Sequence, residues 1–225
     1  MTSQLFAKAA LAQARAPAWR PLALLLFVLL MGTNALLASH APPRGGRPDT
    51  VFTLAGIVRG IGLISISVAL LRIAAGSLRP RWLPDGGFFL YLGISAVALA
   101  LSAAAAGIAA PWPIWARVVL VECAAILLVA PFARWMVAAA VEKPLALAPA
   151  PWFRGLGEWL PPYLLVSLPL VVLACGHAYA SLGLLSLVGA PAFWPLALVD
   201  GLLSTALVLL TLALRVTAYR GVAPE

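Results

Sequence analysis

Long apolar blocks separated by short polar segments make up most of the chain. They cover residues 21–39, 51–76, 87–110, 115–140, 161–184 and 193–216. A helix needs about 20 apolar residues to cross the hydrocarbon core of a bilayer, and each block provides that length. The strands of a β-barrel would be shorter and would alternate in polarity. The pattern therefore predicts an all-α membrane protein, with one bundle of six transmembrane helices at 21–216, a lead at 1–20 and a tail at 217–225.

The composition excludes a water-soluble domain. Of the 225 residues, 64% are hydrophobic and only 10% are charged, and the mean hydropathy is +1.04. Soluble domains carry about 25% charged residues. The loops between the blocks are also too short for a separate domain, which needs about 50 residues. Any function must therefore reside in the bundle or on its surface.

Basic residues alternate between the loops, and the net charge is +8. One set of segments holds most of them: Lys8, Arg15, Arg20, Arg72, Arg79, Arg81, Arg134, Lys143, Arg154, Arg215 and Arg220. The other set holds Arg44, Arg47 and, at the edge of a block, Arg117. Because basic loops stay in the cytoplasm, this alternation predicts a multi-pass protein of a bacterial inner (plasma) membrane with both termini cytoplasmic. We expect anionic lipids on that side as partners, a membrane protein as a further partner, and no nucleic acid.

The basic lead at 1–20 has an amphipathic pattern. Leu5, Ala9 and Ala12, with Phe6 nearby, can share one helical face, which predicts a helix on the cytoplasmic surface with Trp19 among the headgroups. A mobile basic tail is the alternative. The stretch "ALLASHA" offers small residues for signal-peptide cleavage, but Pro42 follows it and the lead is long for such a signal. We therefore expect the first block to be a retained membrane anchor.

Three charged residues, Arg59, Glu122 and Asp200, stand inside apolar blocks. Each lies seven or eight residues from the end of its block, which is about 10–12 Å along a helix axis. His177 and Asn34 fall at a similar depth in two further blocks, so we predict a buried polar cluster of five side chains. Because a lone charge costs about 2.5–3.5 kcal/mol at the centre of a membrane helix, we expect Arg59 to contact at least one of the carboxylates.

The last block also carries a polar stripe. Ser204, Thr211 and Arg215 follow Asp200 at +4, +11 and +15, which keeps them on one side of a helix. The stripe would extend a polar track from Asp200 toward the cytoplasm. It also indicates that this side of the helix faces the interior of the bundle.

Small residues predict where the helices pack closely. Gly56 and Gly60 form a small-xxx-small pair beside Arg59, and block 87–110 contains "SAVALALSAAAAGIAA". Small side chains let helix backbones approach one another and drive association in lipid. We therefore expect both segments to face the interior of the bundle, with block 87–110 in a central position.

Catalytic and metal-binding arrangements are disfavoured. Cys175 and His177 are two residues apart on a helix and face different ways, so a joint metal site is not expected. Ser204, His177 and Asp200 are the residue types of a hydrolase triad, but no nucleophile-elbow motif surrounds a serine. We expect no cofactor, no metal and no catalytic residue. His177 is then a hydrogen-bonded core histidine and Asn34 an interhelical hydrogen-bonder.

Three stretches carry a family resemblance: the basic lead ending "ARAPAW", the segment "WLPPYLLVSL" and the tail "LALRVTAYRG". In these the chain resembles uncharacterised bacterial six-helix inner-membrane proteins, which are similar to the membrane domain fused to some glycerophosphodiester phosphodiesterases. The resemblance implies membrane location. It implies no phosphodiesterase activity, because no catalytic domain is attached to the bundle.

Two classes of function stay open. In the first, the protein is a non-enzymatic accessory subunit or scaffold that the charge cluster locks together. In the second, it is a small proton- or cation-coupled transporter in which Asp200 or Glu122 is the exchanging carboxylate. The lack of a recognisable inverted repeat favours the first. A dry, fully paired cluster would indicate the scaffold, and a cavity reaching the cluster from outside would indicate the transporter.

Overall fold

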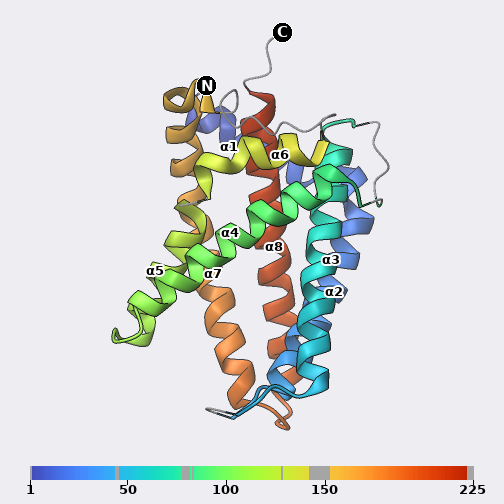
Figure 1. Ribbon diagram of the computed structural model, residues 1–225, viewed down its shortest axis with the longest axis vertical. Helices are drawn as coiled ribbons and strands as arrows, with labels where there is room; N and C mark the ends of the chain where they lie inside the picture. Colours follow the sequence, from blue (N-terminus) through green and yellow to red (C-terminus); the bar gives the residue numbers. More distant parts are fainter. Residues whose placement is uncertain are drawn as a thin grey trace.

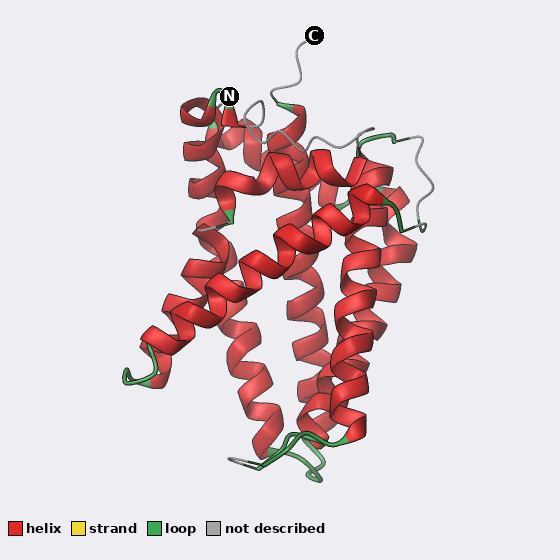
Figure 2. Cartoon of the chain, viewed as in Figure 1, coloured by secondary structure: helices red, strands yellow, loops and turns green. Residues whose placement is uncertain are grey.

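The computed structural model describes residues 2–43, 46–77, 82, 84–127, 129–141 and 153–221. Every regular element in this part is a helix (Figure 2). Six helical segments of the described chain are long and apolar enough to cross a membrane: Pro17–Ser39, Thr50–Ala74, Gly86–Ile108, Ile114–Val141, Leu156–Ser186 and Phe193–Arg220. The predicted all-α fold is therefore confirmed, and the boundaries lie within five residues of those predicted.

The order of elements follows the hydrophobic blocks, with an added helix before the first one. The α-helices are α1 (Ser3–Ala14), α2 (Arg20–Ser39), α3 (Thr50–Ala74), α4 (Gly86–Ile108), α5 (Ile114–Leu127), α6 (Ala133–Val141), α7 (Leu156–Ser186) and α8 (Phe193–Arg220). Short 3-10 helices, η1 (Pro17–Trp19) and η2 (Ala130–Phe132), precede α2 and α6.

The fourth predicted span is not one continuous helix, which corrects the expectation for 115–140. α5 ends at Leu127, η2 follows, and α6 begins at Ala133. Pro131 lies in η2, has no backbone N–H to donate, and would clash with the preceding turn of a continuing α-helix. Figure 1 shows that α6 lies across the bundle rather than extending α5.

α8 is the central helix. It packs along α7, α2, α1 and α6, and Figure 1 shows it between α7 on one side and α2 and α3 on the other. The start of α1 and the end of α8 lie at one end of the bundle, called the terminal end below. The opposite end, called the far end, holds the α2–α3 and α7–α8 loops.

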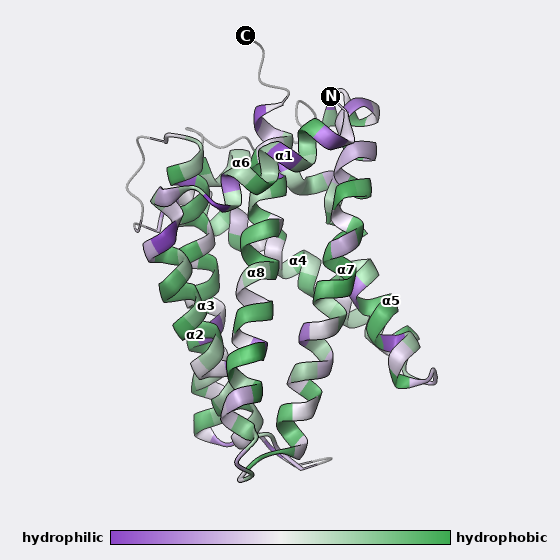
Figure 3. Cartoon of the chain, turned by 180° about the vertical axis from the view of Figure 1, so that it is seen from behind, coloured by the Kyte–Doolittle hydropathy of each residue, from purple (hydrophilic) through white to green (hydrophobic). Residues whose placement is uncertain are grey.

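α4 and α5 form a hairpin that is much less buried than the other spans. Figure 1 shows α4 crossing the bundle obliquely, so that its corner with α5 stands apart from the loops of the far end. The predicted central position of the Ala-rich segment is wrong, because most residues of 95–110 are exposed in the isolated chain, although α4 does pack against α5 and α6. The exposed apolar faces suit contact with lipid, and in Figure 3 helix surfaces are largely hydrophobic, with isolated hydrophilic turns in α5 and α7.

Close helix contacts occur at other glycines than those predicted. A Cβ atom at Gly56 or Gly60 would meet no heavy atom within 4 Å. A Cβ at Gly201 would lie 2.7 Å from the Met31 Cβ and 3.1 Å from its Cα. α8 therefore approaches α2 closely beside Asp200, because Gly201 has no side chain there.

The lead forms the predicted helix, but with another face inward. Phe6 and Ala10 are buried against the bundle, while Leu5 is 58% exposed. The ring of Phe6 meets Tyr163 of α7 edge-on, with centroids 6.0 Å apart. Trp19, expected among the headgroups, is only 1% exposed. Thus α1 is packed onto α7 and α8 as part of the bundle rather than resting beside it.

A buried ion pair ties α3 to its neighbours at the terminal end. Arg72 is 1% exposed, and its Nη2 lies 2.7 Å from Asp85 Oδ1. Its Nε donates to the Ala140 carbonyl of α6 at 2.9 Å. Asp85 also caps α4 by accepting from the Phe88 N–H at 2.9 Å. One carboxylate thus serves both the helix N-terminus and the arginine, which makes the buried charge tolerable.

Candidate functional site

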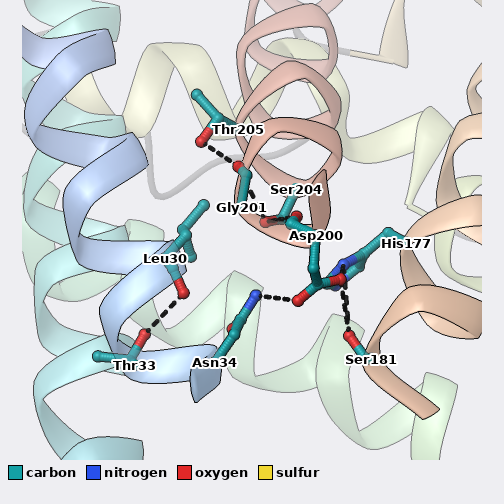
Figure 4. A network of polar contacts seen from close by, with 9 residues as sticks. All are labelled: Leu30, Thr33, Asn34, His177, Ser181, Asp200, Gly201, Ser204 and Thr205. Carbon is teal, nitrogen blue, oxygen red and sulfur yellow. Dashed lines mark hydrogen bonds and ion pairs between the residues drawn. The ribbon is translucent and has the colours of Figure 1, made fainter. Parts of the chain in front are cut away.

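Asp200 is the centre of a polar network inside the bundle (Figure 4). Its side chain is 0% exposed. Oδ2 accepts a hydrogen bond from Asn34 Nδ2 at 2.6 Å. Oδ1 lies 2.7 Å from His177 Nδ1 and accepts from Ser181 Oγ at 3.0 Å. These four residues, called the Asp200 centre below, join α2, α7 and α8.

The local sequence explains how the centre forms. Gly201 lets α2 approach α8, which brings Asn34 within reach of the carboxylate. His177 and Ser181 are four residues apart on α7, so both project from one face of that helix. Ser181 was not predicted as a member of the cluster, although its position four residues after His177 indicates that both side chains lie on one face of the helix.

The network leaves one polar atom unsatisfied. Asn34 Oδ1 is buried and has no hydrogen-bond partner. A buried carbonyl oxygen without a donor is unfavourable. The hydrogen bond from the Asn34 amide nitrogen to the carboxylate offsets this cost. Each carboxylate oxygen of Asp200 therefore has at least one donor, Asn34 on Oδ2 and Ser181 on Oδ1. His177 Nδ1–H supplies a donor to Oδ1 when the ring carries its proton there.

In the part of the chain that the structure describes, Arg59 and Glu122 make no hydrogen bond to the Asp200 centre, and the predicted contact of Arg59 with a carboxylate does not take the form of a close ion pair, although the charge of Asp200 acts on Arg59. Among the described residues, Arg59 forms no ion pair within 4.0 Å of either carboxylate, and Asp200 is held by Asn34, His177 and Ser181 instead. Equal depth did not bring Arg59 within ion-pair distance of Asp200, because α3 touches α8 much less than α2 and α7 do. Glu122 stands on the outlying helix α5.

Arg59 and Glu122 instead line a cavity of about 600 Å³ together with members of the Asp200 centre. This far cavity is formed by the far-end halves of α2, α3 and α7 and by the first turns of α5. Its polar walls include Asn34, His177 and Ser181, so the cavity ends on the side chains that hold Asp200. Arg117, which the sequence placed only at a span edge, also lines it. The structure thus gathers four charged or titratable side chains (Arg59, Arg117, Glu122 and His177) around one space.

The polar stripe of α8 is divided between two roles. The Ser204 hydroxyl donates to the Asp200 backbone carbonyl at 2.6 Å, so it bonds within its own helix. Thr211 and Arg215 line a second cavity of about 540 Å³ nearer the terminal end. The stripe is therefore not a continuous track from Asp200. Glu122 lines both cavities.

The geometry gives little support to metal binding or nucleophilic catalysis. Within the described part of the chain no three His, Cys, Asp or Glu side chains gather as metal ligands do. Ser204 bonds backbone oxygens, and Ser181 donates to the carboxylate rather than facing the free ring nitrogen of His177. His177 Nδ1 and Asp200 Oδ1 are close enough to share a proton, and His177 also lines the far cavity together with Arg59, Arg117 and Glu122.

Comparison with protein-family models, with curated proteins and with solved structures gives no match. The family resemblance noted in the sequence stays a prediction. The function must be argued from the site itself.

Proposed function

We propose that this multi-pass membrane protein is a carrier for a small organic anion, coupled to proton movement at the Asp200 centre. The observation that supports it best is the far cavity. Arg59 lines this space and forms no ion pair within 4.0 Å among the described residues, although the charge of Asp200 acts on it from a greater distance. A scaffold held by buried charges would pair them, since an unpaired charge inside a membrane is costly.

The lining of the far cavity suits an anion. Arg59 and Arg117 offer two guanidinium groups against one carboxylate, Glu122. Guanidinium groups bind carboxylate and phosphate through paired hydrogen bonds, and such bonds are strong where water is excluded. The remaining walls are mainly apolar, and the volume of about 600 Å³ is in the range of small-molecule sites.

The Asp200 centre supplies the proton-handling part of the proposal. His177 Nδ1 and Asp200 Oδ1 are 2.7 Å apart, within direct proton-transfer distance. His177 also lines the cavity, so a proton taken from the cavity side reaches the buried carboxylate through the ring. The groups facing this pair are Asn34 from α2 and Ser181 from α7, with Arg59 and Glu122 across the cavity. A bound anion and a proton would then cross together, which reduces the net charge moved.

The orientation of the carrier belongs to the same proposal. The alternation of basic loops favours a cytoplasmic terminal end, so the far cavity would open to the outside. Reporter fusions before Ser3 and after Arg220 test this. A reporter that is active only in the cytoplasm should be active at both positions. A reporter that is active only outside should be inactive at both, and activity of that reporter at either position would contradict the topology.

Transport is tested with the full-length protein in liposomes that contain the pH dye pyranine. Succinate, glutamate and glucose 6-phosphate are added outside as a dicarboxylate, an amino acid and a phosphomonoester. We expect at least one to acidify the lumen. Arg59→Gln should slow that acidification about tenfold or more, because a charge-assisted contact is lost. Asp200→Asn should remove the proton coupling in a folded protein.

Arg47→Gln is the matched control, because Arg47 is an exposed arginine in the α2–α3 loop. It should transport like the parent. The proposal fails if none of the three anions acidifies the lumen or stabilises the purified protein against heat. It also fails if Arg59→Gln and Asp200→Asn behave like the parent, which would favour the scaffold.

A further inference from the structure

A second cavity lies nearer the terminal end and serves no step of the proposed transport. It has a volume of about 540 Å³ and is enclosed by α3, α4, α5, α6, α7 and α8. Most of its walls are leucine, isoleucine, valine and alanine side chains. We call it the Arg215 cavity, because the guanidinium of that residue is the only cationic group among its described walls.

Arg215 is incompletely satisfied by the protein. Its Nη1 donates to the hydroxyl of Tyr91 at 3.2 Å, and its guanidinium also interacts with the hydroxyl of Tyr163. Its Nε is buried and has no hydrogen-bond partner. No carboxylate within the described residues pairs with it, although Glu122 lines another part of the same cavity. Arg215 is partly buried, and a cation in such a position without a counter-anion is unfavourable, so its guanidinium is still able to bind a negative group.

Buried hydroxyl groups surround this guanidinium. Tyr91 and Tyr163 are each 4% exposed, and both line the cavity. Thr211 lies one turn before Arg215 on α8 and also lines it. One guanidinium beside tyrosine and threonine hydroxyls provides several donors for the oxygens of a phosphate or carboxylate. The apolar walls of α3, α4 and α7 would exclude a hydrated free ion but would accept an acyl chain.

The depth of the cavity also indicates a lipid. Arg215 lies five residues before the end of α8, about 7–8 Å along the axis from that end. This is the level at which a basic side chain meets the headgroups of the adjoining leaflet. The α4–α5 hairpin, which is the least buried part of the bundle, forms part of the wall.

We propose that the Arg215 cavity binds an anionic phospholipid from the leaflet at the terminal end, with the phosphate on Arg215 and an acyl chain along the apolar walls. This site is separate from the Asp200 centre. Arg215 is fifteen residues from Asp200 on α8, a separation of about 22 Å. The proposal therefore does not depend on the transport function, and it is tested by binding alone.

The experiment is native mass spectrometry of the full-length protein released from maltoside micelles, which are uncharged. Phosphatidic acid and phosphatidylcholine with the same acyl chains are added in equal amounts. We expect the parent to retain phosphatidic acid about tenfold over phosphatidylcholine. Arg215→Gln should reduce this preference to about twofold or less, and Arg215→Lys should keep part of it, because an ammonium still attracts phosphate as a point charge.

Two further variants make the result specific. Arg20→Gln, at an exposed arginine near the same end, should keep the full preference. Ser95→Phe should fill the cavity from α4 and reduce lipid retention while leaving Arg215 intact, so the test holds even if Arg215→Gln fails to fold. Equal retention of the two lipids by the parent would overturn the proposal, as would unchanged retention in Ser95→Phe. Displacement of the lipid by millimolar inorganic phosphate would also overturn it, since the site would then bind a free anion.

Discussion

Removing the Asp200 carboxylate should destabilise the protein strongly, because three side chains depend on it. Asp200→Ala leaves Asn34, His177 and Ser181 without their shared acceptor in a fully buried position. Each hydrogen bond to a charged group contributes about 1.5–3 kcal/mol, but the contributions of neighbours do not add. We therefore expect a loss of about 3–5 kcal/mol, the range for breaking a buried charge interaction.

Asp200→Asn should cost much less, about 1 kcal/mol. Its side-chain oxygen can still accept from Ser181 and His177. Its new amide group faces Asn34, whose own amide can rotate so that the oxygen left without a partner in the parent accepts the bond. The network would then keep its shape without the charge.

A double-mutant cycle between Asn34→Ala and Asp200→Ala isolates the contact. The free energy of unfolding is measured by circular dichroism during a denaturant titration in maltoside micelles. Because the two side chains bond directly at 2.6 Å, the coupling should be about 1–3 kcal/mol. Ser102→Ala is the control partner, since its hydroxyl bonds the Ala98 carbonyl within α4. Additivity within about 0.5 kcal/mol for the Asn34 pair would refute the reasoning.

Two further predictions concern helix packing and a helix cap. Gly201→Ala should destabilise by about 1–3 kcal/mol, because the new methyl would stand 2.7 Å from a side-chain carbon of α2; Gly60→Ala, which meets nothing within 4 Å, should be neutral or stabilising. The pKa of Asp49 is lowered first by the backbone N–H of Phe52 and then by His40. The stabilisation from this helix cap is therefore fully present above the ordinary pKa of 3.8, and it is lost as the pH falls through the lower pKa of the folded state. Hydrogen exchange in the first turn of α3 should increase as the pH falls through this range in the parent, but it should not increase in Asp49→Asn. An Asp49 carboxylate whose pKa by NMR is 3.8 or higher would contradict this prediction.

The sequence alone determined the fold class, the spans and the depth of the polar residues. Apolar length sets how many helices cross a membrane, and a fixed rise per residue converts position into depth. That is why Asn34 and His177 could be placed at the level of Asp200 before any contact was known. The same reasoning placed Arg59 and Glu122 at that level, and both do line a cavity that reaches the centre.

Only the tertiary structure decided which of these side chains meet. Contact depends on the rotation, tilt and neighbours of each helix, which depth does not fix. Gly201 draws α2 against α8 and so selects Asn34 as a partner, while α3 touches α8 far less and leaves Arg59 facing the cavity. Pro131 interrupts the fourth span, and α6 turns across the bundle. Hydropathy could not show these outcomes, because lipid-facing and helix-facing positions are equally apolar in a membrane.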